Sequence, residues 1–349
     1  MLARLRWLSK LAVTFISDAS FATSAGWNRF WFTPADPTTL CLIRVLAGLM
    51  LFYTHAIWTL DLEAFFGEHS WFSRDVIAQA NQSGYSWSLL SWCRSPPALW
   101  SLHVAALTTF AMLTLGLWTR GVSVLAFVFT VSYSHRTPGA LFGLDQINGL
   151  LSMYLMLGPS GSLLSVDAWR ARGKGQATDS PSVTANLAIR LMQCHMCVIY
   201  FFAGLSKLQG LSWWNGFAFW GGIANQEYQT LDLTWLSDWP LVINALTHLT
   251  VAFELSYCVL IWNRWTRPLV LMAAIVLHLG IVFALGMPTF GLAMLIANVA
   301  FIQPTLLRTL IEGPSDLPSS GSPPLPHRTH TASQPPTPHF QRHAKRSIN

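Results

Sequence analysis

A single lysine, Lys207, stands at the end of the apolar run Tyr200 to Leu208 and is followed by two tryptophans, Trp213 and Trp214. An amine at the edge of hydrocarbon is costly to keep charged. It therefore either extends to the lipid headgroups or is held neutral, and a neutral amine can take a proton from a substrate. Lys207 is therefore a candidate for either an interfacial anchor or a catalytic base.

The composition places this amine in a membrane protein. Of the 349 residues, 52% are hydrophobic and 10% are charged, whereas roughly 25% are charged in soluble domains. We therefore expect an all-α, polytopic integral membrane protein whose surroundings are the lipid bilayer. The net charge of +6 does not indicate nucleic-acid binding, because the cations lie in short loops and near the termini rather than on one face of a soluble domain.

Eight apolar runs approach the length of about 17 to 25 residues that crosses a bilayer. They cover residues 40–60, 97–118, 120–134, 141–158, 187–206, 240–262, 267–286 and 288–303. The third and the last are short. The sequence thus predicts a helical bundle of about eight spans within a membrane domain at 31–310.

The distribution of lysine and arginine predicts the orientation of this bundle. With the N-terminus in the cytoplasm, most of the 21 cations fall in segments on the cytoplasmic side, as the positive-inside rule requires. An even number of spans then leaves both termini cytoplasmic. Lys207 would lie at the outer end of the fifth span.

Three segments flank or interrupt the bundle. Residues 1–30 begin with basic residues and a short apolar piece, which predicts an interfacial amphipathic segment. The outer loop 61–96 carries tryptophans and acids, and we expect it to fold over the outer face. Residues 311–349 are rich in Pro, Ser, Thr and His, a composition typical of a disordered tail.

Ionisable and amide side chains within the spans are candidate functional groups, because burying them is costly. Asp145, Gln146 and Asn148 make the fourth span polar, so we expect them to line a cavity, although a hydrogen-bonded core is an equal alternative. Arg44 and Arg190 are interpreted as structural.

Glu254 is also interpreted as structural, and we expect it to form an ion pair with Arg44 or Arg190. His278 has no other strongly polar side chain in its own span. Its depth allows it to share an outward-facing pocket with Lys207, with Tyr200 in the lining. A neutral histidine bonded to a backbone carbonyl is the competing interpretation.

His195 lies between Cys194 and Cys197, and the Cys-x-x-Cys spacing occurs in zinc and redox motifs. One such pair in an apolar helix supplies too few ligands, and its surroundings disfavour thiolates. We interpret the three as core residues and expect no metal site.

Much of residues 33–303 resembles the membrane domain of vitamin K-dependent gamma-glutamyl carboxylase and the bacterial proteins grouped with it as horizontally transferred transmembrane domain (HTTM) proteins. The resemblance is carried by several motifs. They are Pro34-Ala35-Asp36-Pro37 with Arg44 and Gly48, Ser165-Val166-Asp167, Arg190 with the block Tyr200 to Leu208 and Trp214-Asn215-Gly216, and the block His278 to Phe290.

The resemblance implies a chemistry for two of these positions. Lys207 matches the lysine that deprotonates the vitamin K hydroquinone in the carboxylase, and His278 matches a histidine of the same cavity. The implied cofactor is reduced vitamin K or a related hydroquinone, without a metal, and the implied partner in the membrane is an isoprenoid quinone. The implied location is a bacterial inner membrane.

Two departures limit what the resemblance implies. Where the carboxylase has an Asn-His pair, this chain has Gly143-Leu144-Asp145. The carboxylase also continues into a large propeptide-recognising domain, whereas this chain continues into the segment 311–349. We therefore expect a carboxylase-like lyase or oxygenase that acts on a small-molecule or peptide substrate. The alternative is a non-enzymatic transporter, or an accessory lipid- or quinone-binding protein.

Overall fold

The computed structural model describes residues 22–71, 73–80 and 86–313. Of the expected interfacial segment 1–30, only residues 22–30 are described, and residues 22–32 are helical. The expected disordered tail lies outside the described residues from residue 314 onward.

The described chain is all-helical, and a helix occupies each of the eight places where the sequence predicts a span. These are α2 (Thr38–Trp58), α5 (Pro96–Leu115), α6 (Thr119–Arg136), α7 (Gly143–Leu157), α9 (Val183–Lys207), α12 (Pro240–Leu260), α13 (Arg267–Ala284) and α14 (Pro288–Asn298). The one extended contact among the described residues is an isolated bridge between Ala35 and Ser182.

In the described part of the chain, five helices are long and apolar enough to cross a membrane, beginning at Thr38, Pro96, Val183, Pro240 and Arg267. A sixth crossing results if α14 and the bent helix after it count as one span. The chain is therefore an integral multi-pass membrane protein. The remaining two helices fall short for visible reasons. The 15 residues of α7 extend about 22 Å, and α6 carries Arg120 and Arg136 in its end turns.

The helix boundaries follow from local sequence. Proline occupies the first turn of α5, α12, α13 and α14, where its missing N–H costs nothing. Ser182 caps α9 by accepting a hydrogen bond from the Ala185 amide. Gly116 ends α5 with φ of +69°, a conformation that glycine adopts without strain.

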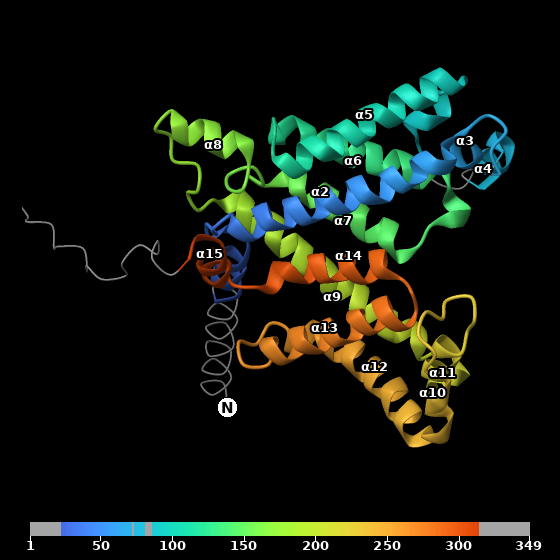
Figure 1. Cartoon of the computed structure of the whole chain (residues 1–349). Helices are drawn as coiled ribbons and strands as arrows, with labels where there is room; N and C mark the ends of the chain where they lie inside the picture. The colour runs from blue at the N-terminus through green and yellow to red at the C-terminus, as the bar shows by residue number, and fades with distance from the viewer. Residues whose placement is uncertain (1–21, 72, 81–85, 314–349) are drawn as a thin grey trace, which may run out of the picture.

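Figure 1 shows the eight helices side by side, with short helices gathered at the two ends of the bundle. At one end, here named the α8 end, lie α8 (Val166–Gly173) and α15 (Pro304–Glu312). At the opposite end, named the α10 end, lie α3 (Leu62–Phe66), α4 (Arg74–Ala80), α10 (Leu211–Trp214) and α11 (Ala218–Ile223). The segments that the cation distribution assigns to one side of the membrane thus share one end of the bundle.

Ion pairs join distant segments at the α8 end. Arg308 of α15 lies 2.7 Å from a carboxylate oxygen of Asp36 and 3.2 Å from one of Asp179. Partial burial opposes ionisation of Asp36, but hydrogen bonds from Thr38 and the Arg308 guanidinium together lower its pKa.

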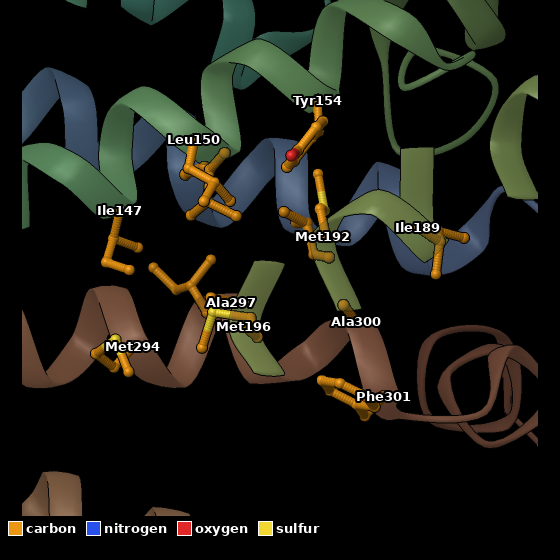
Figure 2. Close-up of a cluster of buried hydrophobic side chains, with 14 of the residues drawn as sticks. Ile147, Leu150, Tyr154, Ile189, Met192, Met196, Met294, Ala297, Ala300 and Phe301 are labelled. Carbon is orange, nitrogen blue, oxygen red and sulfur yellow. The ribbon is translucent and has the colours of Figure 1, made fainter. Parts of the chain in front are cut away.

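The central core lies where α7, α9 and α14 meet. Figure 2 shows Ile147 and Leu150 of α7, Met192 and Met196 of α9 and Met294 of α14 directed toward one another. A second core joins α2, α5 and α6 to α3 and the turn Leu89–Trp92. Helix α3 and the turn Leu89–Trp92, both from the loop 61–96, therefore pack on the ends of α2, α5 and α6. The short helices α10 and α11 pack on α12, and Trp213 of α10 lies beside Lys207.

Candidate functional site

Helices α9 and α12 approach each other closely just before Lys207. A Cβ atom added at Gly204 would lie 2.9 Å from the Leu255 side chain, so only a glycine fits the present spacing. Small residues at such crossings permit the close packing that holds membrane helices together. Lys207 is one helical turn beyond Gly204, and Glu254 directly precedes Leu255, so this crossing brings the amine and the carboxylate together.

Lys207 and Glu254 form an ion pair. The Nζ atom donates a hydrogen bond to Oε1 at 2.9 Å and lies 2.8 Å from Oε2, the latter without hydrogen-bond geometry. The Lys207 side chain is 21% exposed and that of Glu254 is 8% exposed. The ammonium also lies 5.2 Å from the ring centroid of Trp213, within the range of a cation–π contact.

This pairing corrects the sequence-based expectation for Glu254. Its partner is Lys207 rather than Arg44 or Arg190. From the sequence, Lys207, Arg44 and Arg190 are all possible partners of the carboxylate, and position along the chain does not decide among them. The close approach of α9 and α12 at Gly204 selects Lys207.

A buried network of four side chains lies deeper in the same part of the bundle. The Tyr200 hydroxyl is hydrogen-bonded to His278 Nε2 at 2.7 Å and accepts a hydrogen bond from Asn298 Nδ2 at 3.1 Å. The Tyr257 hydroxyl donates to Asn298 Oδ1 at 2.6 Å. The rings of Tyr200 and Tyr257 stack with centroids 3.9 Å apart. Four helices, α9, α12, α13 and α14, thus meet through one network.

His278 has a hydroxyl partner rather than the backbone carbonyl that was the competing interpretation. It is 2% exposed, and its Nδ1 atom has no hydrogen-bond partner among the described residues. Because the Tyr200 hydroxyl already accepts from Asn298, its own hydrogen can be donated to His278 Nε2. A neutral His278 then carries its proton on Nδ1, which leaves a buried N–H donor without an acceptor.

Lys207 and His278 are connected through α9, and no hydrogen bond joins them in the described structure. Tyr200, the partner of His278, precedes Lys207 by two helical turns, a rise of about 10 Å. Two open surface hollows lie elsewhere. One of about 510 Å³ is lined by apolar residues of α2 and α14, and one of about 590 Å³ lies on α8. A common pocket for Lys207 and His278 stays a prediction.

The three polar residues of the fourth expected span do not share one environment. Asp145 accepts a hydrogen bond from the Phe142 amide at 2.9 Å and so caps the start of α7. Gln146 is exposed. Asn148 is 4% exposed, and its Oδ1 has no partner among the described residues. Only Asn148 faces the bundle interior as an uncommitted polar group.

Arg44 is buried at the α8 end and binds backbone carbonyls rather than a carboxylate. Its guanidinium donates to the carbonyls of Ser160 at 2.9 Å, Leu113 at 2.6 Å and Thr114 at 2.9 Å, and also to that of Leu164. These carbonyls end α5 and form the loop after α7. Arg44 therefore ties α2 to two other connections.

Asp167 completes this arrangement from α8. Its two oxygens accept hydrogen bonds from the Trp118 and Thr119 amides and from the Thr119 hydroxyl, at 2.7–3.0 Å. Partial burial opposes ionisation, but these bonds and nearby Arg170 together lower the pKa of Asp167. The Ser165-Val166-Asp167 motif thus fixes the turn between α5 and α6.

Arg190 also has a structural setting. It donates to Gln193 at 3.0 Å, and its guanidinium lies 4.5 Å from the Phe30 ring centroid and 5.9 Å from that of Trp262. His195 Nδ1 is hydrogen-bonded to the Tyr154 hydroxyl at 3.0 Å. Among the described residues, His, Cys, Asp and Glu side chains do not gather in groups of three or more.

Several buried polar residues were not predicted from the sequence. Tyr257 and Asn298 belong to the network around His278. His103 is bonded to the Tyr133 and Thr59 hydroxyls at 2.6 and 2.9 Å, and buried His55 has an unpartnered Nε2. Polar or aromatic residues within apolar runs account for four of them, namely Tyr257, Asn298, His103 and His55. That position was the available signal, but it did not reveal which residues meet.

Together, the fold and these buried polar clusters define an integral membrane helical bundle that holds an ion pair and a hydrogen-bonded network within its spans. Comparison with protein families gives a match to the HTTM domain over residues 32–305. The chain therefore belongs to the HTTM family. No curated protein and no solved structure gives a significant match.

Proposed function

We propose that the chain is a hydroquinone-dependent membrane enzyme, a carboxylase-like lyase or oxygenase in which Lys207 is the base and His278 assists it. One observation carries this proposal. The base-capable pair Lys207–Glu254 and the buried His278, whose Nε2 is bonded to Tyr200 and whose Nδ1 is unpartnered, are both attached to the last two turns of α9, at Lys207 and Tyr200.

The ion pair is compatible with a basic amine. At 2.8–2.9 Å a proton can pass between the two groups, so the resting ammonium–carboxylate pair can convert to amine and carboxylic acid. In that form Lys207 accepts a proton from a substrate while Glu254 holds the proton that the amine released. Glu254 is then a positioning residue for the base.

The residues present fit a hydroquinone. Reduced vitamin K or a related hydroquinone would supply a phenolic proton and reducing electrons for reaction with dioxygen. His278 Nδ1 offers a buried donor to a ring oxygen, and donors placed at developing charge are effective in apolar sites. The Trp213 ring, whose centroid lies 5.2 Å from Lys207 Nζ, offers an aromatic face beside the amine. The carboxyl acceptor would be a small molecule or a peptide.

The test is hydroquinone epoxidation by the purified protein in lipid nanodiscs under oxygen. Lys207→Ala should abolish epoxide formation, and an added small amine should restore part of it. His278→Ala should lower the rate by roughly 10²- to 10⁴-fold, the range for a positioned proton-transfer group. Lys345→Ala is the matched control and should be fully active.

Two outcomes would contradict the proposal. Full activity of Lys207→Arg would make Lys207 an anchor, because a guanidinium does not act as a neutral base at ordinary pH. Stoichiometric quinone binding by the wild type without any epoxide would support the alternative of an accessory quinone-binding protein.

We also infer eight spans with both termini in the cytoplasm of a bacterial cell. The positions of the eight helices and the gathering of the cation-rich segments at the α8 end support this orientation. Reporters that are active on one side only, fused within 159–186 and within 207–239, should give opposite signals. Equal signals would exclude the eight-span arrangement.

A further inference from the structure

Tryptophan and basic side chains gather around α8, on a surface that the proposed reaction does not use. We name this surface the basic corner and define it by Trp118, Trp169, Arg170, Arg172 and Lys174. All five are exposed, and Trp118 and Trp169 are each 71% exposed. A hollow of about 590 Å³ is lined by Trp169, Arg170, Arg172, Gly173 and Lys174.

The basic corner is a built surface rather than a loose tail. Asp167 accepts hydrogen bonds from the Trp118 amide at 3.0 Å and the Thr119 amide at 2.7 Å. Ser165 caps α8 by accepting from the Ala168 amide, and Ala168 is 1% exposed. These contacts fix α8 to the turn between α5 and α6. Trp169 of α8 and Trp118 of that turn are therefore held in a fixed position relative to each other.

The charge of this surface is not neutralised within the described chain. Asp167, the acid of the same helix, already accepts three hydrogen bonds from the α5–α6 turn. Arg170, Arg172 and Lys174 form no ion pair with any described residue. Arg172 donates to the Ala168 carbonyl at 3.5 Å and Arg170 lies near Asp167. An anionic partner would therefore meet three exposed cations without breaking an ion pair.

The position of the corner identifies the partner. It lies at the α8 end of the bundle, where α5 ends (Figure 1). Leu115 and Leu164 lie next to it and are 55% and 36% exposed. Tryptophan favours the boundary between headgroups and acyl chains, and guanidinium groups bind phosphate through paired hydrogen bonds. A soluble polyanion would satisfy the cations but would leave these apolar side chains unexplained.

We propose that the basic corner binds the headgroup of an anionic phospholipid, with Arg170, Arg172 and Lys174 on the phosphate and the two tryptophans at the acyl boundary. This differs from a purely topogenic role of the cations. A topogenic charge acts during insertion, whereas a lipid site gives saturable and headgroup-selective binding to the folded protein.

The experiment measures lipid binding to the purified full chain in detergent by native mass spectrometry. Phosphatidylglycerol is titrated against phosphatidylcholine of the same chain length. The wild type should prefer phosphatidylglycerol. Each cation near a lipid surface contributes on the order of fivefold, so R170Q/R172Q/K174Q should weaken phosphatidylglycerol binding by roughly 100-fold. Phosphatidylcholine carries the same phosphate but is neutral overall, so its binding should weaken far less.

Two further variants separate charge from site. R29Q/R94Q/R264Q removes the same charge from exposed arginines elsewhere and should retain the selectivity. Trp169→Ala keeps the charge and should weaken both lipids. Equal loss in the two triple variants would overturn the proposal, because it would reduce the effect to net charge. Complete displacement of phosphatidylglycerol by excess inorganic phosphate would also overturn it, by making the corner a phosphate site.

Discussion

The Lys207–Glu254 pair predicts an unequal cost for the loss of its two members. Lys207→Met leaves a carboxylate that is 8% exposed, whereas Glu254→Leu leaves an ammonium that is 21% exposed and still lies 5.2 Å from the Trp213 ring. Breaking a fully buried pair costs about 3–5 kcal/mol. This pair is partly exposed, so the cost of breaking it is smaller. We expect Lys207→Met to lower the free energy of unfolding by about 2–4 kcal/mol.

Glu254→Leu should cost less, about 1–2 kcal/mol, because the lysine can extend toward the α10 end and keep its charge solvated. The double variant should recover most of the loss, since an apolar pair of similar volume often replaces a buried ion pair without penalty. The two substitutions should therefore show a coupling energy of about 3 kcal/mol, the larger part of their summed cost of about 4–5 kcal/mol.

Reversible unfolding in mixed micelles with increasing denaturing detergent, followed by far-ultraviolet circular dichroism, gives these four free energies. A snorkelling lysine without a specific partner would cost only a few tenths of a kcal/mol. Additive effects of the two substitutions, with a small cost for Lys207→Met, would refute the ion pair and with it the origin of the proposed base.

Other predictions test the surrounding structure. Arg44→Lys should cost at least about 3 kcal/mol in unfolding free energy, because one ammonium does not reach four carbonyls and leaves some unpaired. Tyr257→Phe should cost about 1 kcal/mol by removing the bond to Asn298, measured in the same assay. Asp36 and Asp167 have lowered pKa values relative to 3.8, so their stabilisation is present above that pH and is lost as the pH falls through the folded-state values. Thermal melting between pH 5 and pH 2 should show this loss, which deepens below pH 3.8, and the variant D36N/D167N should show a smaller one.

The helices could be predicted from sequence because their information is local. Apolar runs bounded by proline, glycine or a capping serine give both length and ends, and all eight expected positions are helical. Whether a helix crosses the bilayer is less local. Helix α6 carries polar groups that are accommodated because the helix packs against other helices. Hydropathy contains no information on that packing.

The partners of the polar residues could not be predicted, because helix order along the chain does not determine helix contacts. The sequence placed Glu254 with an arginine, whereas α12 packs on α9 and meets Lys207. Gly204, one turn before Lys207, was the visible hint of that contact. Asp145 illustrates a different limit. It is polar within an apolar run, yet it serves the first turn of α7 as a cap.

The polar residues within the bundle differ in what they bind, and this difference bears on function. Arg44 and Asp167 bind backbone groups at chain connections, so they are explained by the fold itself. Lys207 binds Glu254, and His278 reaches the rest of the bundle through the Tyr200 hydroxyl. Apolar residues in those positions would leave no backbone group unpaired, and such replacements are often neutral or stabilising. The fold therefore does not require these side-chain pairs, which is the physical reason to look for chemistry at the α10 end of α9 rather than at Arg44.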